Sequence, residues 1–191
     1  ENKWLGSKTK QGFYKKVDKD ILSLDLETLE YRSAKKASFQ TLELTKTIDK
    51  VVDRFKVLVK GKDKAGEFYR KSFAGLFTYV SNRVPEITDD LYKIDDAMKA
   101  GFGWEHGPFQ IWDAIGVEKA LEFMNEIGEK PAAWVQEMLD SGNKSFYTVK
   151  EGVNYYYDIT SKSQKKIPGQ DAFIILDNIR DTKKVWGNAE T

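Results

Sequence analysis

The pattern of apolar positions divides the chain into a helical centre and two flanking segments. In the centre, apolar residues recur at intervals of three and four, which is the period of an amphipathic helix. Gly61 followed by Asp63 indicates a helix stop and a new N-cap, and Pro108 suits the first position of a helix. The pattern predicts helices over residues 39–60, 64–84, 88–101, 108–116, 118–127 and 131–139.

Before this centre, apolar and polar residues alternate at the period of two that a half-buried strand requires. Residues 21–26 alternate in this way, and residues 29–31 are predicted to return beside them as a short hairpin. Residues 12–16 carry aromatic side chains after a glycine, and we interpret them as a turn with an anchored tail. No period-locked repeat is apparent along the chain.

After the centre the pattern again becomes that of strands. Residues 145–149 and 153–159 predict a hairpin with a three-residue loop at 150–152. A last apolar run covers residues 173–176, and the residues from 181 onward are predicted to be a linker. The expected fold class is therefore mainly α, with small β-hairpins flanking a helical bundle.

Composition excludes several kinds of site. Lys and Arg total 31 and Asp and Glu total 30, so the net charge of +1 provides no footprint for nucleic acid or an anionic membrane. The absence of cysteine excludes disulfides, thiolate metal sites and cysteine nucleophiles, and it fits the cytoplasmic location that we expect. No apolar stretch is long enough for a membrane span. Residues 1–6 contain no leader pattern and no initiator Met, so we expect a segment of a longer protein.

The glycines of residues 101–107 are spaced as G-x-G-x-x-x-G, one residue longer than the dinucleotide fingerprint. A phosphate cradle needs a buried strand before its glycines, so that they open a helix at the end of a parallel sheet. Here an amphipathic helix precedes them. We therefore interpret this segment as a corner between two helices, in which small residues allow close approach of the backbone.

His106 is the only histidine, so a catalytic triad or dyad would have to use it. It lies directly before Gly107 in the same corner, where a surface or capping role is the commoner one. Zinc would lack ligands, since one histidine and no cysteine leave only carboxylates. The acidic pairs at 89–90 and 95–96 do not face one another, because neighbours in a helix point about 100° apart. We therefore predict no catalytic, cofactor-binding or metal-binding residue in this chain.

Residues 94–117 resemble the C-terminal helical domain of 3-hydroxyacyl-CoA dehydrogenases. The shared frame is I-D-x-A-M-x-x-G-x-G followed by G-P-F-x-x-x-D-x-x-G. Residues 8–14 are similar to the G-x-G-F-Y ending of such a domain. The resemblance implies three parts. Residues 1–37 would be the tail of a first helical domain with a short hairpin linker, and residues 38–142 a second complete helical domain. Residues 143–191 would be a hairpin with a linker toward a missing domain.

The chain also departs from the pattern of that family. Glu105 stands where the family usually has a proline, and no segment matches the nucleotide domain that carries the family's catalytic histidine and glutamate. The resemblance would place a substrate-handling asparagine near Gly66, where none is present. The pair Asn82 and Arg83 looks similar but lies too late in the sequence. These departures imply a copy that has lost its substrate-handling residues.

The resemblance implies a fragment of an enzyme of fatty-acid β-oxidation, one that oxidises a 3-hydroxyacyl-CoA with NAD and is fused to an enoyl-CoA hydratase. This fragment would be inactive alone and would hold no cofactor. It would pack against the missing nucleotide-binding and first helical domains, shape the acyl-CoA groove, and make or imitate a homodimer contact. The candidate structural or interface corner consists of Gly101, Gly103, His106, Gly107, Pro108, Phe109, Trp112 and Asp113.

Two alternatives remain open. A free-standing helical module for protein interaction or ligand binding would use the aromatic hairpin and the loop at 101–107 as its contact surfaces. An autonomous enzyme would depend on His106.

Overall fold

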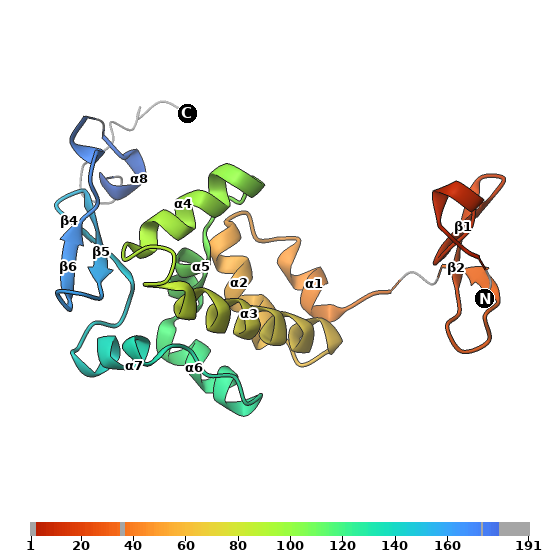
Figure 1. The fold of residues 1–191 in the computed structure, drawn as a ribbon, viewed down its shortest axis with the longest axis horizontal. Coiled ribbons are helices and arrows are strands. Elements are labelled where there is room, and N and C mark those ends of the chain that lie inside the picture. Colours follow the sequence, from red (N-terminus) through yellow and green to blue (C-terminus); the bar gives the residue numbers. More distant parts are fainter. Residues whose placement is uncertain (1–2, 35–36, 173, 180–191) are drawn as a thin grey trace, which may run out of the picture. The chain divides into compact units, whose positions relative to one another are not determined.

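The computed structural model describes residues 3–34, 37–172 and 174–179 of the chain (Figure 1). The chain divides into two compact units, Glu1–Ser38 and Phe39–Thr191. The first unit contains a small sheet, whereas the second contains the helices and another small sheet.

The first unit is a three-stranded antiparallel sheet preceded by one turn of 3-10 helix. Its elements, with the sheet order β1–β2–β3, are η1 (Ser7–Thr9), β1 (Tyr14–Val17), β2 (Asp20–Leu24) and β3 (Tyr31–Ser33). The hairpin predicted within residues 21–31 is confirmed by the pairing of β2 with β3. The interpretation of residues 12–16 as a turn is wrong for residues 14–16, which belong to β1, whereas the chain bends at 12–13. Asp18 takes a left-handed φ of 53°, and the chain turns there so that β1 pairs with β2.

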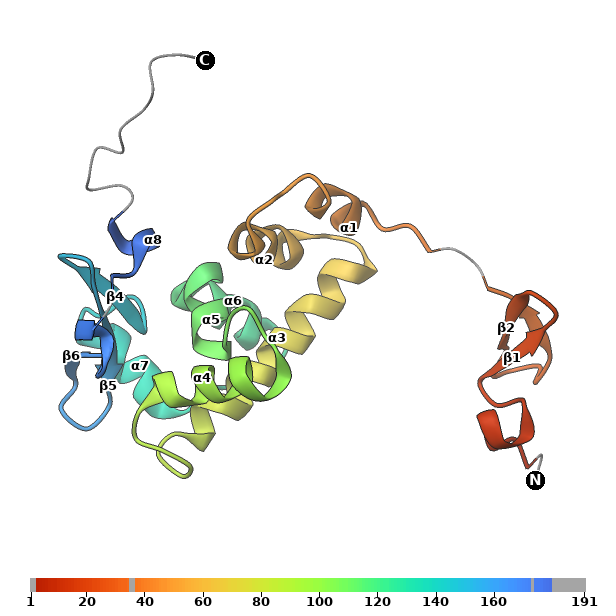
Figure 2. The same cartoon turned by 90° about the horizontal axis from the view of Figure 1, so that it is seen from above.

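The second unit is mainly α-helical, as the apolar period predicted. The side chain of Asp63 accepts a hydrogen bond from the N–H of Gly66, which confirms the predicted N-cap of the third helix. The helices of the unit are α1 (Gln40–Thr45), α2 (Val51–Lys60), α3 (Lys64–Arg83), α4 (Leu91–Phe102), α5 (Pro108–Ile115), α6 (Val117–Glu126), α7 (Ala133–Asp140), η2 (Gln170–Ala172) and α8 (Leu176–Ile179). Figures 1 and 2 show α3 as the long helix of this unit, and α2, α5 and α6 pack against it.

Residues 39–60 form two helices and not the single helix that we predicted. α1 ends at Thr45 and α2 begins at Val51. The hydroxyls of Thr45 and Thr47 donate hydrogen bonds to main-chain carbonyls three residues earlier, at 2.8 and 3.3 Å. Threonine side chains that bond to the main chain in this way compete with the helical ladder, so the polar stretch between the two helices is not helical.

α4 begins and ends later than the predicted span of 88–101. Thr88 is not the N-cap, because its hydroxyl oxygen accepts a hydrogen bond from the N–H of Asp90 at 3.2 Å and the helix begins only at Leu91. At its other end the helix continues to Phe102. It ends at Gly103, which has a left-handed φ of 66°.

The second sheet follows the helices and has the order β4–β5–β6, with β4 (Tyr147–Lys150), β5 (Val153–Asp158) and β6 (Ser163–Lys166). The predicted hairpin is confirmed, but its connection is a two-residue turn at 151–152, because Lys150 pairs directly with Val153. The third strand, β6, was not predicted. Of the predicted apolar run, Phe173 lies outside the described residues, and so does the predicted linker from residue 181 onward.

An aromatic core joins the helices of the second unit to its sheet. The ring centroids of Phe77 and Trp112 lie 4.5 Å apart with nearly parallel planes. The ring of Phe146, directly before β4, lies 5.0 Å from Phe109 and 5.1 Å from Trp112. All four side chains are fully buried. The sheet is therefore anchored in the same hydrophobic core as the helices.

Candidate functional site

Asp95 of α4 closes the N-terminal end of α5. Its side chain is buried, with 1% exposure. One carboxylate oxygen accepts a hydrogen bond from the N–H of Phe109 at 2.9 Å, and the other accepts from the N–H of Gln110 at 3.0 Å. The first N–H groups of a helix have no partner within the helix, and this end of the helix dipole is positive. Asp95 therefore satisfies two such donors and fixes α5 against α4.

Gly107 permits this contact because it has no side chain. A Cβ atom at Gly107 would lie 2.3 Å from the Cβ of Asp95, which is too close for any other residue on this backbone. Pro108 follows at the first helical position, where its missing N–H has no cost. The side-chain oxygen of Gln110 accepts from the N–H of Gly107 at 3.0 Å. The segment thus connects two helices, and of its glycines only Gly107 lies at a close approach between them.

Asp113, one turn further along α5, holds the beginning of the second sheet. One of its oxygens accepts from the N–H of Phe146 and the other from the N–H of Tyr147, both at 2.8 Å. We call this pair of hydrogen bonds the aspartate clamp. The hydroxyl of Tyr147 also donates to Asp95 at 2.9 Å. Tyr147 therefore links both aspartates, and one junction ties together α4, α5 and β4.

Burial raises the pKa of both aspartates of the junction. The pKa of Asp95 rises to about 6 and that of Asp113 to about 7, because removal from water disfavours the charged carboxylate. The main-chain N–H donors oppose this effect by stabilising the charge. All four carboxylate oxygens accept hydrogen bonds from donors in the same unit. The arrangement suits holding elements together better than transferring a proton to a substrate.

The structure places the predicted corner residues in two groups. Gly101 and Gly103 lie at the exposed end of α4, where a Cβ atom would meet nothing within 4 Å. The other predicted residues lie at or beside the junction, and these are His106, Gly107, Pro108, Phe109, Trp112 and Asp113. Sequence reasoning missed the roles of Asp95 and Tyr147. The fixed aspartate of the I-D-x-A-M frame was the available signal for the first of them.

His106 lies beside this junction, on the wall of a pocket of about 620 Å³. Its side chain is half-buried, and its ring meets that of Phe55 edge to face, with 6.2 Å between centroids. Its Nε2 lies 3.6 Å from a carboxylate oxygen of the exposed Glu105. Tyr147 and Asp113 line the same pocket.

Gly66, near which the family resemblance would place an asparagine, is buried at a tight contact. A Cβ atom there would lie 2.1 Å from the carbonyl oxygen of Gly61. Asp63 accepts from the N–H of Gly66 at 3.0 Å and from both the N–H and the hydroxyl of Thr41, which lowers the pKa of Asp63 to about 2. This position therefore serves the packing of α1 against the beginning of α3 and has no room for an asparagine side chain.

The glycine corner does not fit a nicotinamide dinucleotide. A phosphate cradle requires glycines between a parallel strand and a helix, whereas here α4 comes before them. In the part of the chain that the structure describes, no cluster of three or more His, Asp or Glu side chains is arranged to hold a metal ion. None of the helices among these residues combines the length and apolarity needed to cross a membrane.

The fold and the junction together define a mainly helical domain whose buried carboxylates hold an attached sheet. A family model described as the 3-hydroxyacyl-CoA dehydrogenase C-terminal domain matches residues 76–156, from within α3 to within β5. This part of the chain belongs to that family, and the mainly α fold class predicted from the sequence is confirmed. The matched region contains the glycine corner and the aspartate clamp.

Curated relatives extend the similarity over most of the chain. A "Probable 3-hydroxyacyl-CoA dehydrogenase" of Bacillus subtilis is 41% identical over 185 residues, which are 97% of this chain and 23% of the relative. A "Putative fatty acid oxidation complex trifunctional enzyme" of Rickettsia felis is 26% identical over 184 residues, or 92% of this chain and 23% of the relative. The chain thus spans about a quarter of the length of these relatives. No solved structure matches it.

Proposed function

We propose that the chain is a non-catalytic part of a cytoplasmic, NAD-dependent 3-hydroxyacyl-CoA dehydrogenase of fatty-acid β-oxidation. The observation that carries the proposal is the family match over residues 76–156, supported by a relative that is 41% identical and named as a probable enzyme of this kind. The junction geometry supports a non-catalytic role, because Asp95 and Asp113 are occupied with donors of their own unit. In the parent enzyme this domain packs against the nucleotide-binding and first helical domains and shapes the acyl-CoA groove.

Turnover measurements test this proposal. The 191-residue chain and the longer protein are each incubated with a 3-hydroxyacyl-CoA and NAD, and NADH formation is followed by absorbance. We expect NADH from the longer protein and none from the chain. The variant His106→Ala of the longer protein should keep its rate within about twofold, because no step depends on this imidazole. Activity of the isolated chain that disappears in His106→Ala would instead establish an autonomous enzyme.

The pocket beside His106 favours a second candidate, a ligand-binding module. It is lined by both polar and apolar side chains, among them Lys99, Gln110 and Tyr147. Calorimetric titration of the chain with CoA, an acyl-CoA and NAD separates the two candidates. Weak or absent CoA binding agrees with the dehydrogenase part, whereas tight binding of a ligand by the isolated chain would favour the module. Measurable NAD binding would contradict the first proposal.

A further inference from the structure

The two sheets of the chain have the same strand pairing. In the first, Tyr14 pairs with Ser23, and in the second, Tyr147 pairs with Tyr156. A shift of 133 positions converts every pair of the first sheet into a pair of the second, through all three strands and without a gap. Few side chains agree between the two segments, so this repeat is not apparent from sequence periodicity, and the strand pairing reveals it.

The backbone conformations repeat with the same shift. Asp18 and Glu151, in the first turns of the two sheets, both have a left-handed φ of 53°. Leu29 and Lys162, in the second turns, are left-handed at 58° and 50°. Non-glycine residues seldom adopt this conformation, so its recurrence at both turns indicates that the two sheets are structural repeats.

The side-chain bonds at the second turn repeat as well. Asp25 pairs with Arg32 at 3.0 Å, and Asp158 pairs with Lys165 at 2.7 Å. Each aspartate also accepts from a main-chain N–H three residues later. The retained residues include Phe13 and Tyr14 in the first sheet, which match Phe146 and Tyr147 in the second.

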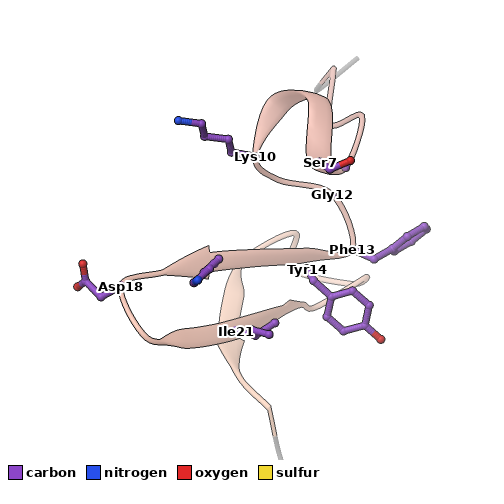
Figure 3. A pocket seen from close by; sticks show the side chains of 9 residues that line it. Ser7, Lys10, Gly12, Phe13, Tyr14, Asp18 and Ile21 are labelled. Atoms are coloured by element: carbon purple, nitrogen blue, oxygen red, sulfur yellow. The ribbon is translucent and has the colours of Figure 1, made fainter.

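What differs is the environment of the matched aromatic pair. Phe146 is fully buried and its N–H is held by the aspartate clamp, whereas Phe13 is 71% exposed and Tyr14 is 67% exposed. Among the described residues, no side chain accepts a hydrogen bond from the N–H of Phe13 or Tyr14. Figure 3 shows both aromatic side chains at one end of the first sheet, beside a pocket of about 740 Å³ with a mostly apolar lining.

We infer that the first sheet docks, through Phe13, Tyr14 and their N–H groups, on a helical domain that presents an aspartate in the position of Asp113. The inference rests on the proposed function, because that domain is supplied by the longer protein. Phe13 enters an aromatic pocket of the domain, as Phe146 does in the second unit. The two N–H groups bind the carboxylate, as those of Phe146 and Tyr147 do.

Three observations favour a preceding helical domain, rather than a second copy of the chain, as the binding partner of the first sheet. The first sheet buries none of the apolar side chains among residues 3–34, and a small sheet of this kind needs a packed face for stability. The second unit already holds its own sheet on its clamp, so a second copy of the chain has no vacant clamp to offer. In the second unit the helical domain comes directly before its sheet along the chain. The same order assigns the first sheet to a helical domain that precedes it in the longer protein.

Amide hydrogen exchange of the 191-residue chain and of the longer protein tests the inference. In the chain alone, we expect the amides of Phe13 and Tyr14 to exchange rapidly, while those of Phe146 and Tyr147 are protected. In the longer protein the first pair should slow by at least about tenfold, and the second pair should stay unchanged. Equal, rapid exchange of Phe13 and Tyr14 in both proteins would overturn the inference.

A variant pair adds a second measurement in the longer protein. Phe13→Ala should restore rapid exchange at Tyr14, whereas Phe102→Ala, at another exposed phenylalanine, should leave it unchanged. Protection in the chain alone that grows with concentration, together with dimers in sedimentation, would identify a second copy as the occupant and overturn the inference. Protection in a longer protein without dehydrogenase turnover would refute the proposed function but leave the docking intact.

Discussion

The first and second sheets of this chain have the same strand pairing and turn conformations, but they differ in the residues that surround them. In the second unit, Phe146 lies in an aromatic core, and Asp113 accepts hydrogen bonds from the N–H groups of Phe146 and Tyr147. In the first unit, the matching Phe13 is largely exposed. The comparison teaches that strand register and turn conformation are encoded within about twenty residues, whereas burial depends on a helical domain outside them. It also identifies the aspartate clamp as the feature that joins such a sheet to its helices.

Removing the buried phenylalanine gives the largest expected contrast between the two sheets. Phe146→Ala should lower the free energy of unfolding of the second unit by about 4 kcal/mol, because it leaves a cavity in a packed aromatic core. Phe13→Ala in the 191-residue chain should change that value by less than about 0.5 kcal/mol, since exposed side chains contribute little. Urea unfolding followed by helical circular dichroism measures both. Similar losses for the two variants would contradict the comparison.

Removing the acceptor of the clamp should have the next largest effect. Asp113→Ala leaves the N–H groups of Phe146 and Tyr147 without their acceptor, with an expected loss of about 3 kcal/mol in the free energy of unfolding. The matched control is Asp96→Ala, which removes an exposed ion pair with Lys99 and should cost less than about 1 kcal/mol. Hydrogen exchange should show faster exchange of β4 in the first variant only. If β4 stays protected in Asp113→Ala, the clamp does not hold the sheet.

A side chain at the glycine corner should weaken the same junction from the helical side. Gly107→Ala places a methyl group against Asp95, and we expect a loss of about 2 kcal/mol from the displaced helix contact. Gly75→Ala is the control, because this position in α3 has open space and alanine should stabilise the helix by about 0.5–1 kcal/mol. Thermal unfolding of both variants provides the measurement. A neutral Gly107→Ala would show that α4 and α5 can move apart freely.

The pH dependence that Asp113 of the clamp gives to stability should be opposite in sign to that of Asp25 in the first sheet. The raised pKa of Asp113, about 7, means that the folded second unit binds more protons than the unfolded chain between about pH 4 and 7. Its contribution to the free energy of unfolding is therefore largest at low pH and declines as the pH rises through this window. The pKa of Asp25 in the first sheet is instead lowered, chiefly by the N–H of Thr28, so its contribution is present above about pH 4 and is lost on acidification.

The variant Asp113→Asn measures the first of these two effects. From pH 8 to pH 5, the parent chain should gain on the order of 1 kcal/mol of stability relative to this variant, which cannot titrate. Urea unfolding at each pH gives the difference. If the parent chain instead loses stability relative to Asp113→Asn on acidification, burial does not raise the pKa of Asp113.

Local chemistry in the sequence decided much of the fold. The three-and-four spacing of apolar residues placed the helices, Asp63 marked the N-cap of α3, and Pro108 marked the first position of α5. These signals depend only on neighbouring residues, because helix periodicity and caps are satisfied within one or two turns. The glycine corner was recognised for the same reason, since an amphipathic helix and not a strand precedes it.

Tertiary structure decided the rest, because the deciding contacts join residues far apart in the sequence. The bond of Asp113 to Phe146 spans 33 positions, and that of Tyr147 to Asp95 spans 52. The family frame marks both aspartate positions, but neither the neighbouring residues nor the helix period shows that the two side chains are removed from water when α4, α5 and β4 meet. The likeness of the two sheets could not be recognised from the sequence either, because many different side chains are compatible with the same strand pairing and turn conformation. The sequence by itself therefore determined most of the helices and the family resemblance. Only the folded chain revealed the break between α1 and α2, the clamp, and the strand pairing that the two sheets have in common.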